Sequence, residues 1–182
     1  MFMSHEPAIQ SLTHETSLFG KTIDSIEFAR NCGQLTGYCA VAELARLQDL
    51  VGVNTGVVAV TVVGELDEQR RPWLHLAVRG ELGLVCQRCL GVVSHTLEIE
   101  AHLRLIRTGE PWPEDEVDEG SEGQADEAIA ADEGLLISSL VEEEIILSLP
   151  YAPMHEACEL PGEDELNRKA SPFAALAVLK KH

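Results

Sequence analysis

The chain has few aromatic residues, few basic residues and no long hydrophobic run. Aromatic residues make up 4% of its 182 residues, although hydrophobic residues as a whole make up 45%. We therefore expect a core built from aliphatic side chains. A chain of this length can bury roughly 70% of its unfolded surface, so it does not depend on disulfides or metals to fold. No apolar run approaches the ~20 residues of a membrane-spanning helix, so we expect no membrane partner.

The shortage of basic residues limits the partners that the protein can bind. There are 13 lysine and arginine residues against 31 acidic residues, and the formal net charge is -18. A protein that coats nucleic acid needs a basic surface to neutralise phosphates, so this balance argues against such a role for the whole molecule. A negative surface attracts basic proteins instead.

Much of the acidity lies in one segment. Eleven acidic residues and no basic residue occur from Glu110 to Glu133, together with two prolines and two glycines. Such a segment cannot bury enough apolar surface to offset its ordering entropy, so we predict an acidic disordered insert over residues 110–133. A solvated loop without a specific task is the alternative interpretation.

The cysteines do not form the pattern of a secreted protein. Five cysteines, an odd number at irregular spacing, are not typical of a disulfide framework. Residues 1–10 contain no basic stretch followed by an apolar core, so no secretory signal is expected. We therefore expect a cytoplasmic protein with reduced thiols.

Alternating apolar and polar residues predict several β-strands. Segments 35–41, 57–65 and 73–78 alternate, and the clearest case places Leu97, Ile99, Ala101, Leu103 and Leu105 on one face. Strands with one buried and one solvent-exposed face favour an antiparallel sheet. Four to five strands joined by short turns indicate a meander or a partly closed barrel. Residues 42–50 have the leucine spacing of a short amphipathic helix.

A long helix is predicted over residues 135–149, where apolar residues form one broad face and Pro150 ends the helix. Glu144 projects near the middle of that face, whereas Glu142 and Glu143 are expected to point outward. A buried carboxylate needs a partner, and Arg88 is one candidate. Alternatively, the helix rolls so that Glu144 lies at its edge.

These patterns together predict an α+β fold in which an antiparallel sheet packs against the long helix. We expect residues 1–19 to form a flexible arm and residues 20–182 to form a single domain that contains the acidic insert. Pro172 is expected to begin a short terminal helix.

Two thiols separated by two residues, Cys86 and Cys89, precede a small turn at Gly91. A second such group, His155 and Cys158, follows 65 residues later. Together these four side chains match the ligand set of one structural zinc ion, with no open position for catalysis. Ordinary reduced cysteines are the alternative, because the long separation requires the helix to return the chain to the hairpin.

A dithiol redox protein that uses Cys86 and Cys89 is a further alternative. Such motifs usually lie at a helix N-terminus, where the helix dipole lowers the thiol pKa, but here a strand is predicted to follow. Neither a glycine-rich phosphate loop nor a serine nucleophile elbow is present. We therefore expect no enzyme activity and no small-molecule substrate.

Several arginines lie within the predicted strands. Arg79, Arg88 and Arg104 are candidates for contact with a partner or with RNA. Scattered strand arginines with no common task are the alternative.

Four stretches, taken in their order, resemble the bacterial YceD family, which is named for large ribosomal RNA subunit accumulation. They are Cys86-Gln-Arg-Cys89-Leu, the run from Val141 to Pro150, the loop through His155 and Cys158, and the ending from Pro172 to Lys180. The resemblance extends roughly from Ile23 to Lys180. It implies a non-catalytic factor in large-subunit ribosome biogenesis that supports the synthesis, processing or stability of 23S rRNA. It supplies no catalytic residues.

A ribosomal protein or assembly factor is therefore the expected partner. The acidic insert is the expected site of contact, because its charge complements a basic protein. Direct contact with rRNA through the arginine-bearing strands stays open.

Overall fold

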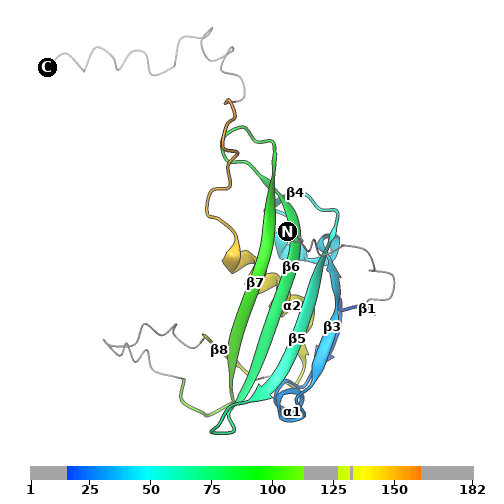
Figure 1. Cartoon of the computed structure of the whole chain (residues 1–182), viewed down its shortest axis with the longest axis vertical. Helices are drawn as coiled ribbons and strands as arrows, with labels where there is room; N and C mark the ends of the chain where they lie inside the picture. Colours follow the sequence, from blue (N-terminus) through cyan, green and yellow to red (C-terminus); the bar gives the residue numbers. More distant parts are fainter. Residues whose placement is uncertain (1–15, 113–126, 132, 161–182) are drawn as a thin grey trace, which may run out of the picture.

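The computed structural model describes residues 16–112, 127–131 and 133–160 (Figure 1). Within these residues one mixed sheet has seven strands, which are β1 (Thr16–Ser17), β3 (Gln34–Ala40), β4 (Val51–Val53), β5 (Val57–Leu66), β6 (Pro72–Val85), β7 (Val92–Ile106) and β8 (Glu127–Ala130). Their order is β1-β3-β5-β6-β7-β8, and β4 pairs with β6 beside this path. A smaller sheet pairs β2 (Thr22–Ile23) with β9 (Leu135–Leu136).

The longest strands, β6 and β7, form the centre of the sheet. They pair antiparallel without a register shift, from the Trp73–Arg104 pair to the Val85–Val92 pair. Because their sequences alternate, one face of each strand is apolar. On β7 this face is Leu97, Ile99, Ala101, Leu103 and Leu105, and all five are buried as predicted.

Within the described residues, two α-helices accompany the sheet. α2 (Ile137–Ser148) crosses the buried face, and α1 (Ser25–Arg30) packs at one end of β5 and β6 (Figure 1). Asp24 caps α1, because its carboxylate accepts a hydrogen bond from the backbone N–H of Glu27 at 2.8 Å. Among the described residues, neither helix has the length and apolar character needed to cross a bilayer.

The α+β class is confirmed, but the sheet is larger and less uniform than the alternation predicts. It has seven strands instead of four or five, and β1–β3 and β7–β8 pair in parallel. Its path among the described residues is open, with β1 and β8 at its two edges, instead of a partly closed barrel. The additional strands β1, β4 and β8 have only two to four residues. A period of two is not detectable over so few residues.

Two segments that were predicted to lie outside the sheet contribute strands to it. The arm predicted for residues 1–19 contains β1, and Leu18 beside it is buried. The predicted acidic insert contains β8, which pairs with the end of β7. Residues 1–15 and 113–126, and the short helix expected after Pro172, lie outside the described residues.

Residues 42–50 do not form the predicted amphipathic helix. They contain parts of two 3-10 turns, Val41–Glu43 and Ala45–Leu47, separated by Leu44. Leu44 has an extended backbone (φ −87°, ψ 92°), which interrupts helical hydrogen bonding. The prediction was therefore wrong about the local conformation.

α2 carries two buried carboxyl groups, because Glu142 and Glu144 are each only 7% exposed. Glu142 was expected to point outward, but its carboxylate accepts hydrogen bonds from the backbone N–H groups of Arg46 and Leu47. These donors belong to the second 3-10 turn, where the Leu47 N–H is shared between Glu142 and the Leu44 carbonyl, which accepts at 3.2 Å. Glu142 therefore fastens this turn to α2.

Glu144 has a different environment. Burial, together with the charges of Glu127 and Glu143, raises its pKa to about 7. Arg88, its expected partner, forms other contacts in the β6–β7 turn. No ion pair or hydrogen bond joins Glu144 to the rest of the described chain.

Replacing Glu144 with glutamine is expected to remove a pH dependence of stability. The folded pKa lies above the usual 4.5, so the protonated carboxyl stabilises the fold fully below about pH 4.5. That contribution is lost as the pH rises through about 7. Since one pKa unit corresponds to about 1.4 kcal/mol, the loss is at most about 3 kcal/mol.

Urea unfolding near pH 5 and near pH 8 measures this difference. Glu68→Gln, at an exposed position in the β5–β6 turn, is the control and keeps the wild-type pH dependence. If Glu144→Gln loses as much stability between these two pH values as the wild type does, Glu144 is not the source of the pH dependence.

Candidate metal centre

The turn between β6 and β7 holds two thiols close together. The backbone N–H of Cys86 donates to the Gly91 carbonyl at 2.8 Å, and the Leu90 N–H donates to the Cys86 carbonyl at 3.0 Å. Leu90 has a positive φ of 62°, which closes the turn. Backbone N–H groups of Arg88 and Cys89 point toward the Cys86 sulfur. The turn therefore has the form of a metal knuckle, in which backbone amides support thiolate ligands.

The segment after α2 returns to this turn. Pro150 follows the helix, and the Pro153 carbonyl accepts a hydrogen bond of 2.8 Å from the backbone N–H of Gln87. This contact aligns residues 154–158 with the hairpin. His155 and Cys158 consequently lie beside the two thiols of the turn.

The four side chains predicted as ligands do meet. One ligand atom from each of Cys86, Cys89, His155 and Cys158 lies within 4.8 Å of all the others. The Cys86 and Cys158 sulfurs are 3.8 Å apart, and the Cys89 sulfur is 3.4 Å from His155 Nδ1. Zinc–sulfur bonds of about 2.3 Å and zinc–nitrogen bonds of about 2.0 Å place tetrahedral ligands at such separations. The cluster could therefore hold a metal ion.

Neighbouring groups orient the ligands. His155 Nε2 lies 2.9 Å from the Val92 carbonyl, which can only accept, so Nε2 carries the proton and Nδ1 is free to bind a metal. Arg88 Nε donates to the Cys158 sulfur at 2.9 Å, and Arg88 Nη2 donates to the His155 carbonyl at 2.8 Å. Arg88 therefore joins the two segments, a role that the sequence pattern alone does not indicate.

The groups around the cluster favour a thiolate at Cys86. The pKa of Cys86 is lowered to about 5, chiefly because the Cys89 backbone N–H donates to its sulfur. The Gly91 N–H lowers the pKa of Cys89, but burial and the neighbouring sulfurs of Cys86 and Cys158 raise it above its usual value. Hydrogen bonds to the Cys86 and Cys158 sulfurs raise the pKa of His155. A divalent cation that binds here displaces protons, because its ligands must be deprotonated.

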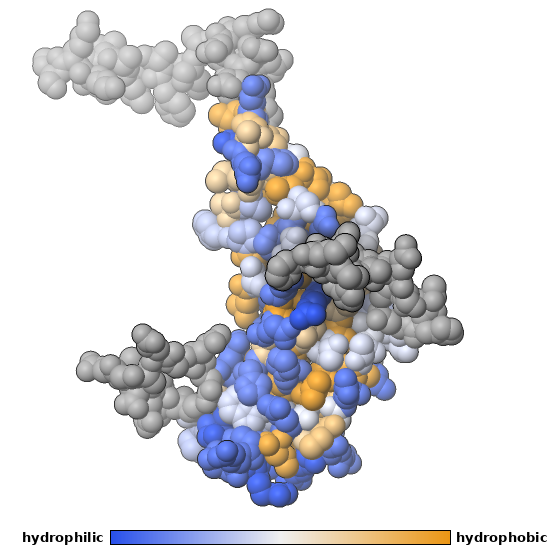
Figure 2. Space-filling view, in the orientation of Figure 1, coloured by the Kyte–Doolittle hydropathy of each residue, from blue (hydrophilic) through white to orange (hydrophobic). Residues whose placement is uncertain are grey.

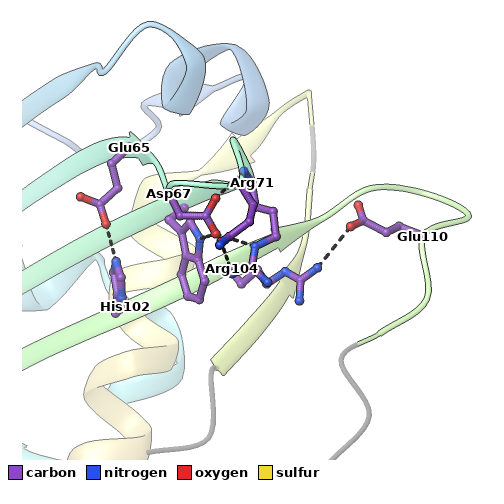
Figure 3. Close-up of polar contacts among 8 residues, drawn as sticks. Glu65, Asp67, Arg71, His102, Arg104 and Glu110 are labelled. Atoms are coloured by element: carbon purple, nitrogen blue, oxygen red, sulfur yellow. Dashed lines mark hydrogen bonds and ion pairs between the residues drawn. The ribbon is translucent and has the colours of Figure 1, made fainter.

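The three candidate contact arginines do not lie together. Arg88 belongs to the metal centre, whereas Arg79 forms an ion pair with Glu100 on the exposed sheet face. Arg104 lies near the opposite end of β7 and pairs with Glu110 (Figure 3). All three are thus engaged within the protein, and they form no continuous basic surface.

Acidic residues surround these strand arginines. Figure 3 shows Arg71 against Asp67 and His102 against Glu65, close to the Arg104–Glu110 pair. The exposed face of β6 and β7 therefore carries several pairs of opposite charges.

The remaining two cysteines lie outside the centre. Cys32 is exposed after α1, and Cys39 is buried in β3, where burial raises its thiol pKa to about 11. Neither belongs to the group of four possible ligands.

Comparison with known proteins connects this chain to a family. The family model described as "Large ribosomal RNA subunit accumulation protein YceD" matches residues 74–180, more than half of the chain. The chain belongs to the YceD family. A relative from Haemophilus influenzae with the same description is 32% identical over 175 residues, which cover 88% of this chain and 95% of the relative. No solved structure matches the chain. The resemblance predicted from the four short stretches is thereby confirmed.

Replacing one ligand is expected to abolish stable zinc binding. Apparent binding free energies of about 10–16 kcal/mol, divided among four ligands, give about 2.5–4 kcal/mol per ligand. We therefore expect Cys158→Ser to weaken the zinc affinity by about 100- to 1000-fold. Purified wild-type protein should contain one zinc per chain by elemental analysis, and Cys158→Ser should lose it to a weak chelator. Cys32→Ser is the matched control because Cys32 is exposed and separate from the centre. Equal zinc contents in the two variants would exclude Cys158 as a ligand.

Proposed function

We propose that this protein is a non-catalytic factor that supports the accumulation of 23S rRNA, and that it holds one structural zinc ion. Membership of the YceD family connects the chain with large-subunit rRNA accumulation. The observation that supports a structural centre is the convergence of Cys86, Cys89, His155 and Cys158 from two distant segments. Four protein ligands leave no open position for substrate, so the metal would stabilise a surface instead of performing chemistry.

The location of the centre supports this role. It joins the tip of the longest hairpin to the segment after α2, and both lie at one end of the sheet (Figure 1). Apolar side chains are exposed around it, namely Leu90, Val92, Met154 and Leu160. Figure 2 shows hydrophobic surface over this end and mainly hydrophilic surface over the opposite end. A metal that fixes two segments would keep such a surface in one conformation.

A ribosomal protein or assembly factor is the partner that we propose. The net charge of -18 favours a basic protein, and ribosome synthesis takes place in the cytoplasm, where we expect this protein to act. Direct contact with rRNA finds less support, since Arg79, Arg88 and Arg104 are paired within the protein.

A thiol redox function is the second candidate. It is favoured by the lowered pKa of Cys86, because a thiolate is the reactive form of cysteine. However, the pair lies in a β-turn without a helix N-terminus, and His155 and Cys158 approach both sulfurs. These neighbours suit a metal better than a disulfide exchange partner.

Thiol modification distinguishes these two candidates. In the zinc-bound protein we expect a maleimide reagent to label only Cys32 quickly, because metal-bound and buried thiolates are protected. Addition of a strong chelator should release one zinc and expose Cys86, Cys89 and Cys158. Rapid labelling of Cys86 at neutral pH in protein that never contained metal would support redox chemistry instead.

The biological role is tested by removing the gene and measuring 23S relative to 16S rRNA. We expect a lower ratio without the protein and restoration by wild type or Cys32→Ser, but not by Cys158→Ser at equal protein level. An unchanged ratio in the deletion strain would refute the proposed role. Restoration by Cys158→Ser would show that the metal centre is not needed for this role.

A further inference from the structure

One edge of β7 is open along most of its length. β6 pairs with one side of the strand from Val92 to Arg104, whereas β8 covers the other side only from Leu103 to Ile106. Among the described residues, no strand lies beside residues 93–102 on that second side (Figure 1). An open strand edge presents unpaired backbone groups that can bind another strand.

Hydrogen bonds at both ends show which backbone groups face this edge. The Val92 carbonyl accepts from His155 Nε2, and the Ile106 carbonyl accepts from the Ala131 N–H at 2.8 Å. Both carbonyls therefore point away from β6. In an antiparallel ladder every second residue points its N–H and C=O in the same direction.

The same alternation applies between these ends, because the β6–β7 ladder has no register shift. The outward residues over 94–100 are Ser94, Thr96, Glu98 and Glu100, and His102 follows at the start of the β8 pairing. Each of the first four presents both its N–H and its C=O at the edge, and none of these groups bonds to another part of the described chain.

A hollow lies beside the middle of the open edge. It has a volume of about 280 Å³ and is lined by residues 95–99 of β7 and by Ser148 at the end of α2. A strand added to β7 would direct alternate side chains toward this hollow. Backbone hydrogen bonds and side-chain pockets are the two components of binding by strand addition.

The charges around the edge favour a cationic occupant. Glu81, Glu98 and Glu100 lie on the outer face of β6 and β7, where Arg79 is the neighbouring cation paired with Glu100. Beyond the end of the open stretch, Glu127 of β8 approaches the buried Glu144 of α2. Glu144 is itself only 7% exposed, so the exposed glutamates of β6 and β7 are the charges that a partner can reach.

A second copy of the chain fits this edge less well. It would bring the same glutamates against each other, and like charges on adjacent strands are unfavourable. The net charge of -18 on each chain adds to the repulsion.

We propose that the open edge of β7 binds an extended, lysine- or arginine-bearing segment of another protein by β-strand addition. This inference rests on the proposed function and deepens it, since it assigns a binding site to the basic protein partner. The bound segment lies beside Ser94–Glu100, with one side chain in the hollow near Ser148 and a cation toward Glu98.

Thr96 allows a specific test of the edge. Its N–H points away from β6, so Thr96→Pro removes an edge donor without removing a β6–β7 hydrogen bond, and proline is tolerated at such edge positions. Thr96→Ala removes the same side chain but keeps the donor. Both variants should retain zinc and the slow amide exchange of Leu97 and Ile99, which shows that they fold.

The probe is an acetylated peptide of about ten residues that alternates lysine and valine, and a peptide that alternates glutamate and valine is its control. With Thr96→Ala we expect the lysine peptide to slow amide exchange at Ser94, Thr96, Glu98 and Glu100, as measured by NMR. Affinity for Thr96→Pro should be about tenfold weaker, the effect of one or two lost hydrogen bonds.

Equal affinity of the two variants, protection at other residues, or equal binding of the glutamate peptide would overturn the proposal. Protection of the same amides by self-association without peptide would assign the edge to a second copy and would also overturn it.

Complementation in cells separates this inference from the proposed function. If the gene deletion leaves the 23S to 16S ratio unchanged, the proposed function fails, whatever the peptide result. If the deletion lowers the ratio, Thr96→Ala should restore it and Thr96→Pro should not. Restoration by both variants would leave the function in place and refute the role of the edge.

Discussion

The unbroken ladder between β6 and β7 is the constraint on which the rest of the structure depends. Its pairs run from Trp73–Arg104 to Val85–Val92 without a bulge. A shift of one residue would exchange the buried and exposed faces of β7 and reverse the direction of its backbone groups. The same register therefore fixes the hydrophobic core, the position of the Cys86–Gly91 turn and the outward groups of the open edge. Glycines help to maintain it, because a side chain at Gly83 would approach Val92 within 2.9 Å.

The metal centre closes the end of this ladder that lies farthest from α1. The turn has only a few contacts of its own, among them the bond from Gln87 N–H to the Pro153 carbonyl. Arg88 adds bonds to Cys158 and His155, so the two segments meet even without an ion. This arrangement lowers the ordering entropy that metal binding must overcome, since the ligands are already adjacent. The positive charge of Arg88 would also compensate part of the negative charge of thiolates bound to a metal.

The sequence predicts the parts of the fold that have a long local pattern. Alternation over β5, β6 and β7 and helical spacing over α2 identify these elements because burial of one face decides their residues. It does not predict β1 and β8, whose pairing depends on distant partners. The four ligand residues are identifiable because cysteine and histidine spacing is chemically specific. The burial of Glu142 could not be predicted from local sequence. Its carboxylate binds N–H groups of a 3-10 turn around Arg46, which lies 96 residues earlier.

The distribution of acids distinguishes structural carboxylates from those available to a partner. Glu142 is satisfied by two backbone donors, and Glu100 is paired with Arg79 and lies 3.0 Å from His75. Glu144 is buried without such a partner, although a buried ion is costly unless it is paired. Its raised pKa reduces this cost by favouring the neutral form. The protein thus carries one carboxylate that backbone donors hold and one carboxyl whose burial favours the neutral form.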